Sequence, residues 1–589
     1  MDRFRQLKKR ELPRAALKPW LLTVRVASVF VLLAFVTSCA NRETPAVESL
    51  IVADSAVESD QIGAVTDALL RIGHRGQPAT WPTYGGDWAQ TRYSSLDQIQ
   101  RENVSQLRPA WIAQTGVLGT FEATPIVLGL EMYVTTPAEQ GLQKVLRLDS
   151  TTGETVWQVD LESEERSRLA ATEDGHLPRD FGPHRGVAVY GDRVYVGTLN
   201  GSLLALRRDT GDRIFEVQTD SPRITGAPLA AQGRIIVGLS WVDRGAVQAF
   251  DAKSGDLLWT WHTIPSPQDG GWWGDWIERL PGREEIDLGR DIAQEKANQV
   301  RLSETWRTGG GSAPMTPTFD HSLGLVYISI GGPDPHGFPP PAEPHPGDMR
   351  WTNSICALHI ENGSMAWCYQ FLPHDTKGAS GPTPGILINL NIEGRMREAV
   401  ARFSGLGNLY VWDRKGGELL GVSDNYIPVE NTTGGKAGAN LIGVAGTVWS
   451  PGAYSFETGL LYSTNRRMPE YFEPRETQRP GGEYGNIAAV NPITGEVVWT
   501  RQTEKPMAGG TLATAGGLVF AGRTTGWFDA YDATTGERLW SFRTGAGCNS
   551  APVTYEVAGR QYVAVSCGGH GLLDPESGDA IVAFSLVPD

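Results

Sequence analysis

The chain has 589 residues, of which 70 are glycine and 37 are proline, and its formal net charge at pH 7 is −15. The acidic balance excludes the basic surface that nucleic-acid-binding proteins use, so no nucleic-acid partner is expected. Abundant glycine and proline are typical of a protein rich in turns, which favours an all-β fold.

A targeting segment is predicted at the N-terminus. A basic stretch precedes an apolar run from Val26 to Val36, which ends shortly before Cys39. A small residue before such a cysteine resembles the processing site of bacterial lipoproteins, so residues 1–38 are predicted to be a signal peptide and Cys39 to carry lipid. The alternative is an uncleaved anchor, but the run is short for a span of about 20 residues. Ala40 resembles the sorting signal for the outer membrane and favours a lipoprotein there, facing the periplasm.

Residues 40–79 lack hydrophobic periodicity, so residues 39–79 are predicted to be the lipidated cysteine and a flexible tether. The rest of the chain, residues 80–589, is long enough for several domains by length alone. One repeated unit, however, runs through all of it. The repeats therefore favour a single large ring over separate domains.

The repeated unit is a strand, a turn that ends in glycine, and an aromatic residue that opens the next strand. The turn glycines and their aromatic partners are Gly153 with Trp157, Gly211 with Phe215, Gly255 with Trp259, Gly363 with Trp367, Gly495 with Trp499 and Gly536 with Trp540. Gly417 is a degenerate copy with Gly421 in the aromatic position. The closest turn glycines are spaced as expected for four-stranded propeller blades, which are roughly 40–50 residues long.

The two ends of the repeat region predict an eighth blade. Residues 580–586 form a strand with no turn after it, and residues 106–111 supply the missing strand with Trp111. Closing one blade from both ends removes an open sheet edge. We therefore predict an all-β, eight-bladed propeller. An array of β-sandwiches is the alternative, and it explains the glycine-then-tryptophan repeat less well.

Four further cysteines lie in the repeat region, and export to an oxidising compartment permits disulfides between them. Four cysteines allow three connectivities. The local pairs are favoured because each flanks a turn almost symmetrically: Cys356 with Cys368, and Cys548 with Cys567. Buried free thiols are the alternative. The sequence has no Cys-x-x-Cys-His motif, so no covalent c-type haem is expected on this chain.

Several segments resemble a known family. The motifs are Trp81–Asp87 with Arg92–Leu96, Arg185–Tyr190, Gly509–Phe520 and Val563–Gly571. They are similar to segments of the quinoprotein dehydrogenases, which use pyrroloquinoline quinone (PQQ), and the last resembles the membrane glucose dehydrogenase branch. The resemblance extends over residues 80–589.

The resemblance implies a PQQ site whose contacts fall at Glu122, Arg185, Thr225 and Asn465. A bidentate cation such as Arg185 suits a cofactor carboxylate. Each of these residues has an alternative role as a polar group that satisfies loop backbone. The family also uses a divalent metal, Ca²⁺, to polarise the quinone and a carboxylate base to take the substrate proton.

Other family positions are changed in this sequence. The stacking tryptophan is replaced by Pro314, a metal-binding asparagine by Gly332, the catalytic aspartate by Gly378, the cation over the quinone by Gly405, and the paired cysteines of the alcohol branch by Arg179 and Asp180. Asp243 is a candidate metal ligand in place of a glutamate, and Asp375 is a candidate base. A surface or turn aspartate is the alternative for both.

An aromatic insert, Gly270–Trp276, either grips a sugar or a partner or forms a small core of its own. Two functions remain open at this stage. The first is a PQQ-dependent dehydrogenase that oxidises an alcohol or sugar hydroxyl and passes electrons to a separate acceptor, a quinone or a cytochrome. The second is a propeller without catalysis that acts as a binding or assembly scaffold at the outer membrane.

Overall fold

The computed structural model describes residues 62–138, 141–162, 182–221, 223–240, 243–333, 345–376, 381–427, 445–468, 482–571, 573 and 576–587. The predicted signal peptide and Cys39 lie outside these residues. Within them, the helices are all too short or too polar to cross a membrane. Residues 60–589 form one compact unit.

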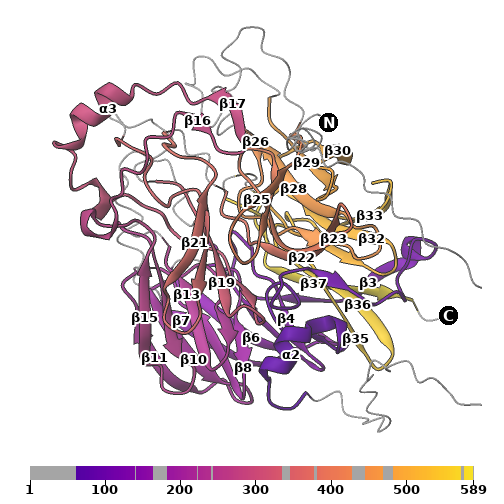
Figure 1. Cartoon of the computed structure of the whole chain (residues 1–589). Helices are drawn as coiled ribbons and strands as arrows, with labels where there is room; N and C mark the ends of the chain where they lie inside the picture. The colour runs from indigo at the N-terminus through magenta and orange to yellow at the C-terminus, as the bar shows by residue number, and fades with distance from the viewer. Residues whose placement is uncertain are drawn as a thin grey trace, which may run out of the picture. The chain divides into compact units, whose positions relative to one another are not determined.

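Eight sheets of four or five strands make up most of this unit (Figure 1). This arrangement confirms the predicted all-β, eight-bladed propeller. We number the blades 1 to 8 in chain order of their innermost strands. A separate two-stranded sheet, β16 (Arg279–Leu280) and β17 (Arg283–Asp287), lies in an insert between blades 3 and 4.

Blade 1 contains β1 (Thr80–Trp81), β4 (Ile126–Leu128), β5 (Glu131–Thr135), β6 (Leu142–Asp149) and β7 (Thr155–Glu162). Blade 2 contains β8 (Ala188–Tyr190), β9 (Arg193–Gly197), β10 (Ser202–Arg207) and β11 (Arg213–Gln218). Blade 3 contains β12 (Leu229–Ala231), β13 (Arg234–Gly238), β14 (Ala246–Asp251) and β15 (Leu257–His262). Blade 4 contains β18 (Thr318–Asp320), β19 (Leu325–Ile330), β20 (Ser354–His359) and β21 (Met365–Gln370).

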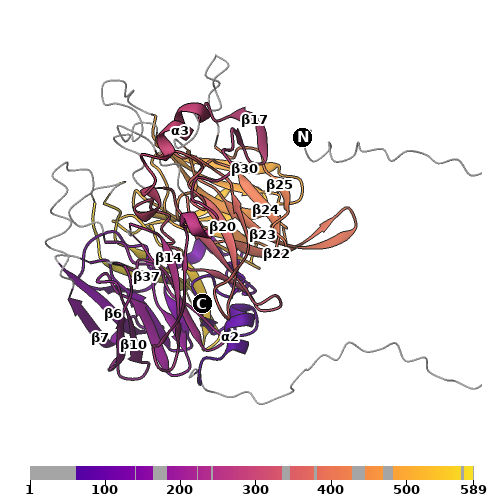
Figure 2. The same ribbon diagram turned by 60° about the vertical axis from the view of Figure 1, so that its left-hand side comes forward.

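Blade 5 contains β22 (Ile386–Ile392), β23 (Arg395–Phe403), β24 (Leu409–Asp413) and β25 (Leu419–Val422), and its first hairpin projects beyond the sheet (Figure 2). Blade 6 contains β26 (Ala445–Gly446), β27 (Ala453–Tyr454), β28 (Leu461–Arg467), β29 (Tyr484–Val490) and β30 (Val497–Thr503). Blade 7 contains β2 (Tyr93–Ser94), β31 (Thr511–Thr514), β32 (Leu518–Arg523), β33 (Trp527–Asp532) and β34 (Arg538–Arg543).

Blade 8 is built from both ends of the repeat region, as predicted. Its strands β35 (Val553–Val557), β36 (Arg560–Cys567) and β37 (Ala580–Leu586) are completed by β3 (Leu107–Gln114). Strands β3 and β37 pair antiparallel from Leu107 opposite Leu586 to Gln114 opposite Ala580. The ring is thus closed by backbone hydrogen bonds between segments from its two ends.

The folded region begins earlier than predicted. Helix α2 (Asp67–Ile72) lies within the predicted tether, and Val65 and Leu70 are buried in the hydrophobic core of the first blades. A helix of six residues is too short to give a readable hydrophobic period, which explains why the sequence did not reveal it. The tether prediction is therefore wrong for residues 62–79.

Neighbouring blades are joined by the repeated tryptophan and glycine. The Trp111 ring of blade 8 covers Gly153 in the turn of blade 1, where a Cβ would lie 2.5 Å from the ring. Gly153 has a φ of +75°, which favours glycine independently of this contact. The Trp111 Nε1 donates to the Ser150 carbonyl at 2.9 Å. Each indole therefore fills an apolar space and caps a backbone carbonyl of the next blade.

The same contact recurs around the ring. The rings of Trp157, Phe215, Trp259, Trp367 and Trp499 cover Gly211, Gly255, Gly363, Gly417 and Gly536 respectively. Between blades 5 and 6, where Gly421 replaces the aromatic residue, the Asp424 backbone N–H bonds the Gly495 carbonyl at 2.9 Å instead. Trp540 of blade 7 donates to the Leu107 carbonyl of blade 8 at 3.1 Å.

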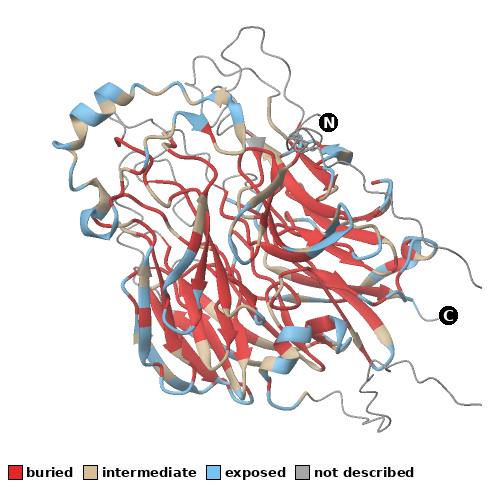
Figure 3. Cartoon of the chain, in the orientation of Figure 1, coloured by how far each residue is buried: buried red, intermediate tan, exposed pale blue. Residues whose placement is uncertain are grey.

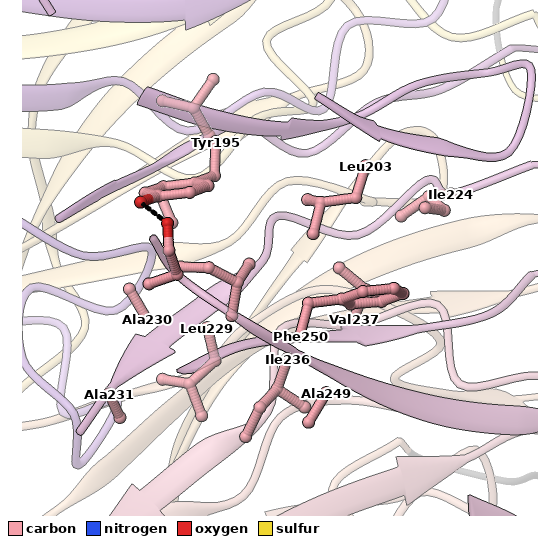
Figure 4. Packing of buried hydrophobic residues seen from close by; sticks show 14 of the residues in the cluster. Tyr195, Leu203, Ile224, Leu229, Ala230, Ala231, Ile236, Val237, Ala249 and Phe250 are labelled. Atoms are coloured by element: carbon pink, nitrogen blue, oxygen red, sulfur yellow. Dashed lines mark hydrogen bonds between the residues drawn. The ribbon is translucent and has the colours of Figure 1, made fainter. Parts of the chain in front are cut away.

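The core consists of apolar side chains between the blades. Inner strands such as β19 are buried along their whole length, because neighbouring blades cover both faces. Outer strands such as β3 alternate buried with exposed residues, as Figure 3 shows. Figure 4 shows the contact of blades 2 and 3, where Tyr195 and Leu203 face Ile236 and Phe250.

The structure contains both local disulfides expected from the sequence, Cys356–Cys368 and Cys548–Cys567. Cys356 and Cys368 are directly opposite each other on β20 and β21. The first disulfide therefore staples the hairpin that carries the Gly363 turn. The second joins the end of β36 to the loop that precedes β35.

Residues 78–94, which we call the plug segment, cross the ring axis. They contact the first or innermost strand of seven blades, through β1–β4, Trp88–Ala230, Trp88–Phe319, Ala89–Leu387, Thr91–Tyr454, β2–β31 and Pro78–Glu556. Innermost strands surround the axis, so a segment that reaches seven of them lies on it. Arg92 donates to the carbonyls of Tyr84, Thr511 and Pro552 at 2.5 to 2.9 Å, and burial lowers its pKa to about 10.

The aromatic insert forms a core of its own. Trp272 is fully buried with Ile264 and Met349, and Trp273 and Trp306 pack against them. The remaining helix of the insert, α3 (Ile292–Gln299), has no buried residue. The aromatic residues of the insert thus have a structural role, the more ordinary of the two expected from the sequence.

Removing one docked indole should destabilise the ring. We expect Trp499→Ala to lower the unfolding free energy by about 3–5 kcal/mol, through lost burial and a cavity over Gly536. The matched control is Val498→Ala on the same strand, whose side chain is 43 % exposed. Thermal and urea unfolding measure both variants. Equal midpoints for the two would contradict the docking role.

Acid should destabilise the fold through buried histidines. Burial lowers the pKa of His74 from 6.5 to about 4, although the Thr80 carbonyl partly opposes this. Since the unfolded chain binds the proton first, roughly 3 kcal/mol of stability is present above pH 6.5 and is lost as pH falls toward about 4.

His74→Gln should therefore show a smaller loss of unfolding free energy than wild type between about pH 7 and about pH 4.5. Exposed His359→Gln is the control, with the wild-type pH dependence expected. Urea unfolding at both pH values makes the comparison. A wild-type pH dependence in His74→Gln would refute the assignment.

Candidate functional site

The candidate site lies where the segments before the innermost strands converge. Glu122 precedes β4, Arg185 precedes β8, Thr225 precedes β12 and Pro314 precedes β18. Innermost strands of a propeller start around one axis, so residues just before them are brought together. The plug segment contacts the same strands, and its Tyr84 packs beside Ala227 and Met315.

A buried ion pair forms the centre of the site. Arg185 Nη2 lies 2.6 Å from Glu122 Oε2, and both side chains are at most 5 % exposed. Arg185 Nη1 also donates to Thr225 Oγ1 at 3.2 Å and to the Pro314 carbonyl at 3.3 Å. Glu122, Thr225 and Pro314, three of the residues predicted to contact a cofactor or to floor its site, thus bond the Arg185 guanidinium.

Glu122 is held in its ionised form. Burial opposes ionisation, but Arg185, His570 and Arg466 together hold the pKa of the carboxyl below its usual range. His570 Nε2 lies 3.4 Å from Glu122 Oε1. At neutral pH the site therefore contains a buried carboxylate between an arginine and an imidazole.

An aromatic stack extends from this carboxylate. The Trp449 ring is parallel to His570, with an interplanar angle of 3° and centroids 5.8 Å apart. The Arg466 guanidinium carbon lies 5.1 Å from the Trp449 ring centroid. Trp449 also packs against the cluster of Tyr84, Ala227 and Met315.

The sequence reasoning did not identify Trp449 or Arg466, and it noted His570 only as part of a motif. Trp449 lies between β26 and β27, Arg466 lies on β28, and His570 follows β36. Position before an innermost strand was a usable signal for Trp449. The sequence of β28 gave no comparable signal for Arg466.

Asn465 is bonded within blade 6. Its Oδ1 accepts from Thr447 at 2.5 Å and from Ser463 at 2.9 Å, and its Nδ2 donates to Asn486 Oδ1 at 2.7 Å. These contacts correspond to the structural alternative for this residue. In the described residues no bond joins Asn465 to Glu122 or Arg185.

Asp375 belongs to a different cluster. Its Oδ2 accepts from Asn353 Nδ2 at 2.9 Å, and its carbonyl lies 3.4 Å from His345 Nε2. The neighbouring His374 lies 3.5 Å from Glu295 of α3. The contact between His374 and Glu295 ties residues 345–376 to the insert. Among the described residues, neither of these two contacts of Asp375 involves Glu122.

The described residues do not form a metal site. No group of three or more His, Cys, Asp or Glu side chains among them is arranged to bind a metal ion. Asp243 is exposed, and its backbone carbonyl accepts from Gly310 at 3.0 Å. The residues that the structure describes thus offer Ca²⁺ no cluster of three or more side chains of these types.

Backbone segments pack closely around Gly405, where the resemblance places a cation in the family. A Cβ on Gly446 would lie 2.3 Å from the Gly405 carbonyl oxygen, and one on Gly381 would lie 2.7 Å from the Gly405 nitrogen. Three segments therefore approach one another at glycines around residue 405. Gly378, Arg179 and Asp180 lie outside the described residues.

Known proteins resemble this chain over most of its length. The family described as "PQQ: Glucose/ethanol/alcohol dehydrogenase, beta-propeller domain" matches residues 81–440 and 478–563. A quinohemoprotein alcohol dehydrogenase of Comamonas testosteroni is 31 % identical over 545 residues, 84 % of this chain and 73 % of the relative. A lanthanide-dependent methanol dehydrogenase of Methylacidiphilum fumariolicum is 28 % identical, with 92 % of each chain covered.

A solved structure agrees with these similarities. The crystal structure of the Comamonas testosteroni quinohemoprotein alcohol dehydrogenase has a TM-score of 0.71 and 27 % identity, and the alignment covers 89 % of this chain and 84 % of that chain. The chain therefore belongs to the family of PQQ-type alcohol and glucose dehydrogenase propellers. The resemblance found in the sequence motifs is confirmed.

The central ion pair makes a testable contribution to stability. Arg185→Gln leaves a buried carboxylate without its partner, so we expect a raised Glu122 pKa and a loss of about 3–5 kcal/mol in unfolding free energy. The double variant Glu122→Gln/Arg185→Gln should recover part of this loss, because it buries no charge. Urea unfolding measures each variant. A double variant less stable than Arg185→Gln would contradict the pairing.

Proposed function

We propose that this protein is a membrane-anchored lipoprotein that binds PQQ at the ring axis and oxidises an alcohol or sugar hydroxyl. The observation that carries the proposal is the buried Glu122–Arg185 pair at the centre of a propeller that belongs to the PQQ family. The residues of this pair are two of those that the sequence resemblance assigns to the cofactor.

The described residues fit a planar, multiply charged cofactor. Arg185 and Arg466 are cations suited to carboxylates, and the flat Trp449 ring is suited to stacking. Trp449 Nε1 is buried and has no hydrogen-bond partner among the described residues, so it is available to an acceptor on a ligand. When bound, PQQ supplies an ortho-quinone that accepts the hydride equivalent of the substrate.

The side chains at the axis have separate tasks in this proposal. Arg185 holds Glu122 ionised and orients it, while Thr225 bonds the same guanidinium. Glu122 and His570 are the acid–base pair beside Trp449, and the proton of the substrate hydroxyl is transferred to them. Asp375, the candidate base from the sequence, has no task in this proposal, and its carboxylate accepts a hydrogen bond from Asn353. Tyr84 closes the floor and limits access of water from the plug side.

The metal ion and the electron acceptor have different places in the proposed reaction. No step of the proposal uses Ca²⁺, because the described residues contain no cluster of three or more His, Cys, Asp or Glu side chains arranged to bind a metal ion. Electrons leave to a separate acceptor, a quinone or a cytochrome, because the chain has no c-type haem motif. Cys39 anchors the protein by lipid, facing the periplasm and most consistently with the outer membrane.

A second function, a binding or assembly scaffold at the outer membrane, has one specific observation in its favour. The resemblance places a family cation at Gly405, and Gly381 and Gly446 pack against residue 405 so closely that neither has room for a Cβ. A propeller that has lost catalysis would tolerate such closure. The two functions differ in whether the cofactor binds.

The deciding experiment is a titration of the purified mature domain with PQQ, with and without Ca²⁺, followed by the absorbance of the cofactor. We expect saturable binding that does not require Ca²⁺ and that Arg185→Ala weakens about tenfold or more. Arg207→Ala is the control, an exposed arginine on the same blade. Failure of wild type to bind at high PQQ concentration would refute the enzyme and favour the scaffold, to be followed by pull-downs from outer membranes.

A further inference from the structure

A cavity lies between the outer parts of blades 1 and 2. Its volume is about 410 Å³, which is within the range of small-ligand sites. The start of β6, the end of β7, the loop between β9 and β10, and β11 form its walls. Its polar lining residues are Gln143, Asp160, Thr198, Asn200, Arg213 and Glu216, and leucines supply the apolar part.

The strand register of blade 1 shows at which end of the ring this cavity lies. Strand β5 ends at Thr135, opposite Val145 near the start of β6. Strand β6 begins at Leu142, opposite Glu162 at the end of β7. Strand β4 is antiparallel to β5 and so begins at the same end, where Glu122 precedes it. The cavity therefore lies at the end of the ring that carries the candidate site, on outer strands rather than at the axis.

Gln143 brings an unpartnered donor to the wall of this cavity. Its side chain is 1 % exposed, and its Oε1 accepts from the Leu199 backbone N–H at 3.3 Å. That bond leaves the two N–H groups of Nε2 on the other side of the amide. Nε2 is buried and has no hydrogen-bond partner among the described residues. A buried donor without an acceptor is unfavourable, so a ligand that supplies an acceptor here binds with advantage.

Two carboxylates of the cavity retain the capacity to accept hydrogen bonds. Asp160 Oδ1 accepts from Gln158 Nε2 at 2.8 Å, and Glu216 Oε2 accepts from Arg213 Nη1 at 3.2 Å. A carboxylate can accept about four hydrogen bonds, so lone pairs remain on both groups. The pair of Arg213 and Glu216 is exposed and therefore only weakly held. A ligand donor can thus bond either carboxylate.

This combination of groups selects a neutral ligand that is rich in hydroxyl groups. An anion would be repelled by Asp160 and Glu216, and a cation would meet Arg213 and the N–H groups of Gln143. A hydroxyl both donates and accepts, so a sugar can accept from the amide with one hydroxyl and donate to the carboxylates with others. The leucines suit the C–H groups of a sugar ring.

We propose that the cavity between blades 1 and 2 binds a neutral saccharide, with Gln143 donating to one hydroxyl and Asp160 and Glu216 accepting from others. This site goes beyond the proposed function, because it lies away from the axis and requires neither PQQ nor a reaction.

The first variant of the test is Gln143→Met, which keeps the length of the side chain and removes the donor. Its matched control is Gln248→Met on β14. Gln248 is 2 % exposed, but its Nε2 already donates to Asp220 at 2.8 Å and to Thr260 at 3.1 Å. Melting temperatures show whether each variant is folded.

The second variant is Asp160→Ala, an exposed position at which a substitution leaves the fold intact. Its control is Asp212→Ala, an exposed aspartate in the turn before β11, at the opposite end of blade 2. Calorimetry uses the full-length protein without added PQQ, in a detergent that has no sugar headgroup. The probes are glucose and maltose, with glucuronate as the anionic and glucosamine as the cationic comparison.

We expect wild type to bind glucose or maltose more tightly than either charged sugar. Gln143→Met should weaken this binding about tenfold, and Asp160→Ala about tenfold or more, as for loss of a hydrogen bond to a ligand. Gln143→Met should also melt close to wild type, because the donor that it removes has no partner in the protein. Both controls should bind as wild type does.

Wild-type affinity for the neutral sugars in folded Gln143→Met or in Asp160→Ala would overturn the proposal, since the sugar would then be bound elsewhere, such as at the axis. Failure of wild type to bind glucose and maltose would overturn it too, as would tighter binding of glucuronate or glucosamine. Because PQQ is absent from these titrations, none of their outcomes bears on the proposed cofactor, and the two proposals fail separately.

Discussion

The docking of an outer-strand indole on the turn glycine of the next blade is the contact on which this ring depends. Gly153 shows the constraint, because its positive φ and the Trp111 ring above it both exclude a side chain. The indole N–H then donates to the Ser150 carbonyl of the turn, which also accepts from the Tyr555 hydroxyl. Repetition of one contact fixes both the distance and the direction between successive sheets.

A closed ring of this kind creates an axis, and the remaining features follow from it. The plug segment crosses the axis and bonds the innermost strands, with Arg92 donating to three carbonyls at the centre. One end of the channel is thereby filled by chain. Beside the plug segment, the loops before the innermost strands bring Glu122 and Arg185 together, so the same closure that stabilises the ring also builds the site.

The site joins residues that the sequence motifs identified to residues that they did not. Glu122, Arg185 and Thr225 were identified from the motifs, and the structure brings Trp449, His570 and Arg466 to them. Electrostatics accounts for the central pair, since a buried carboxylate requires a partner.

The sequence by itself determined the features that depend on local chemistry. Turn glycines followed by tryptophan gave the blades, the unpaired strands at both ends gave the closure of β3 on β37, and cysteines flanking hairpin turns gave the disulfides. Motifs also identified Glu122 and Arg185 individually. Tertiary structure alone decided that these two bond each other and that Trp449, Arg466 and His570 join them. Their blades are far apart in sequence, and only ring closure brings them together, so no local period or spacing encodes the contact. For the same reason Asn465 and Asp375, placed by motif position, are bonded elsewhere in the fold.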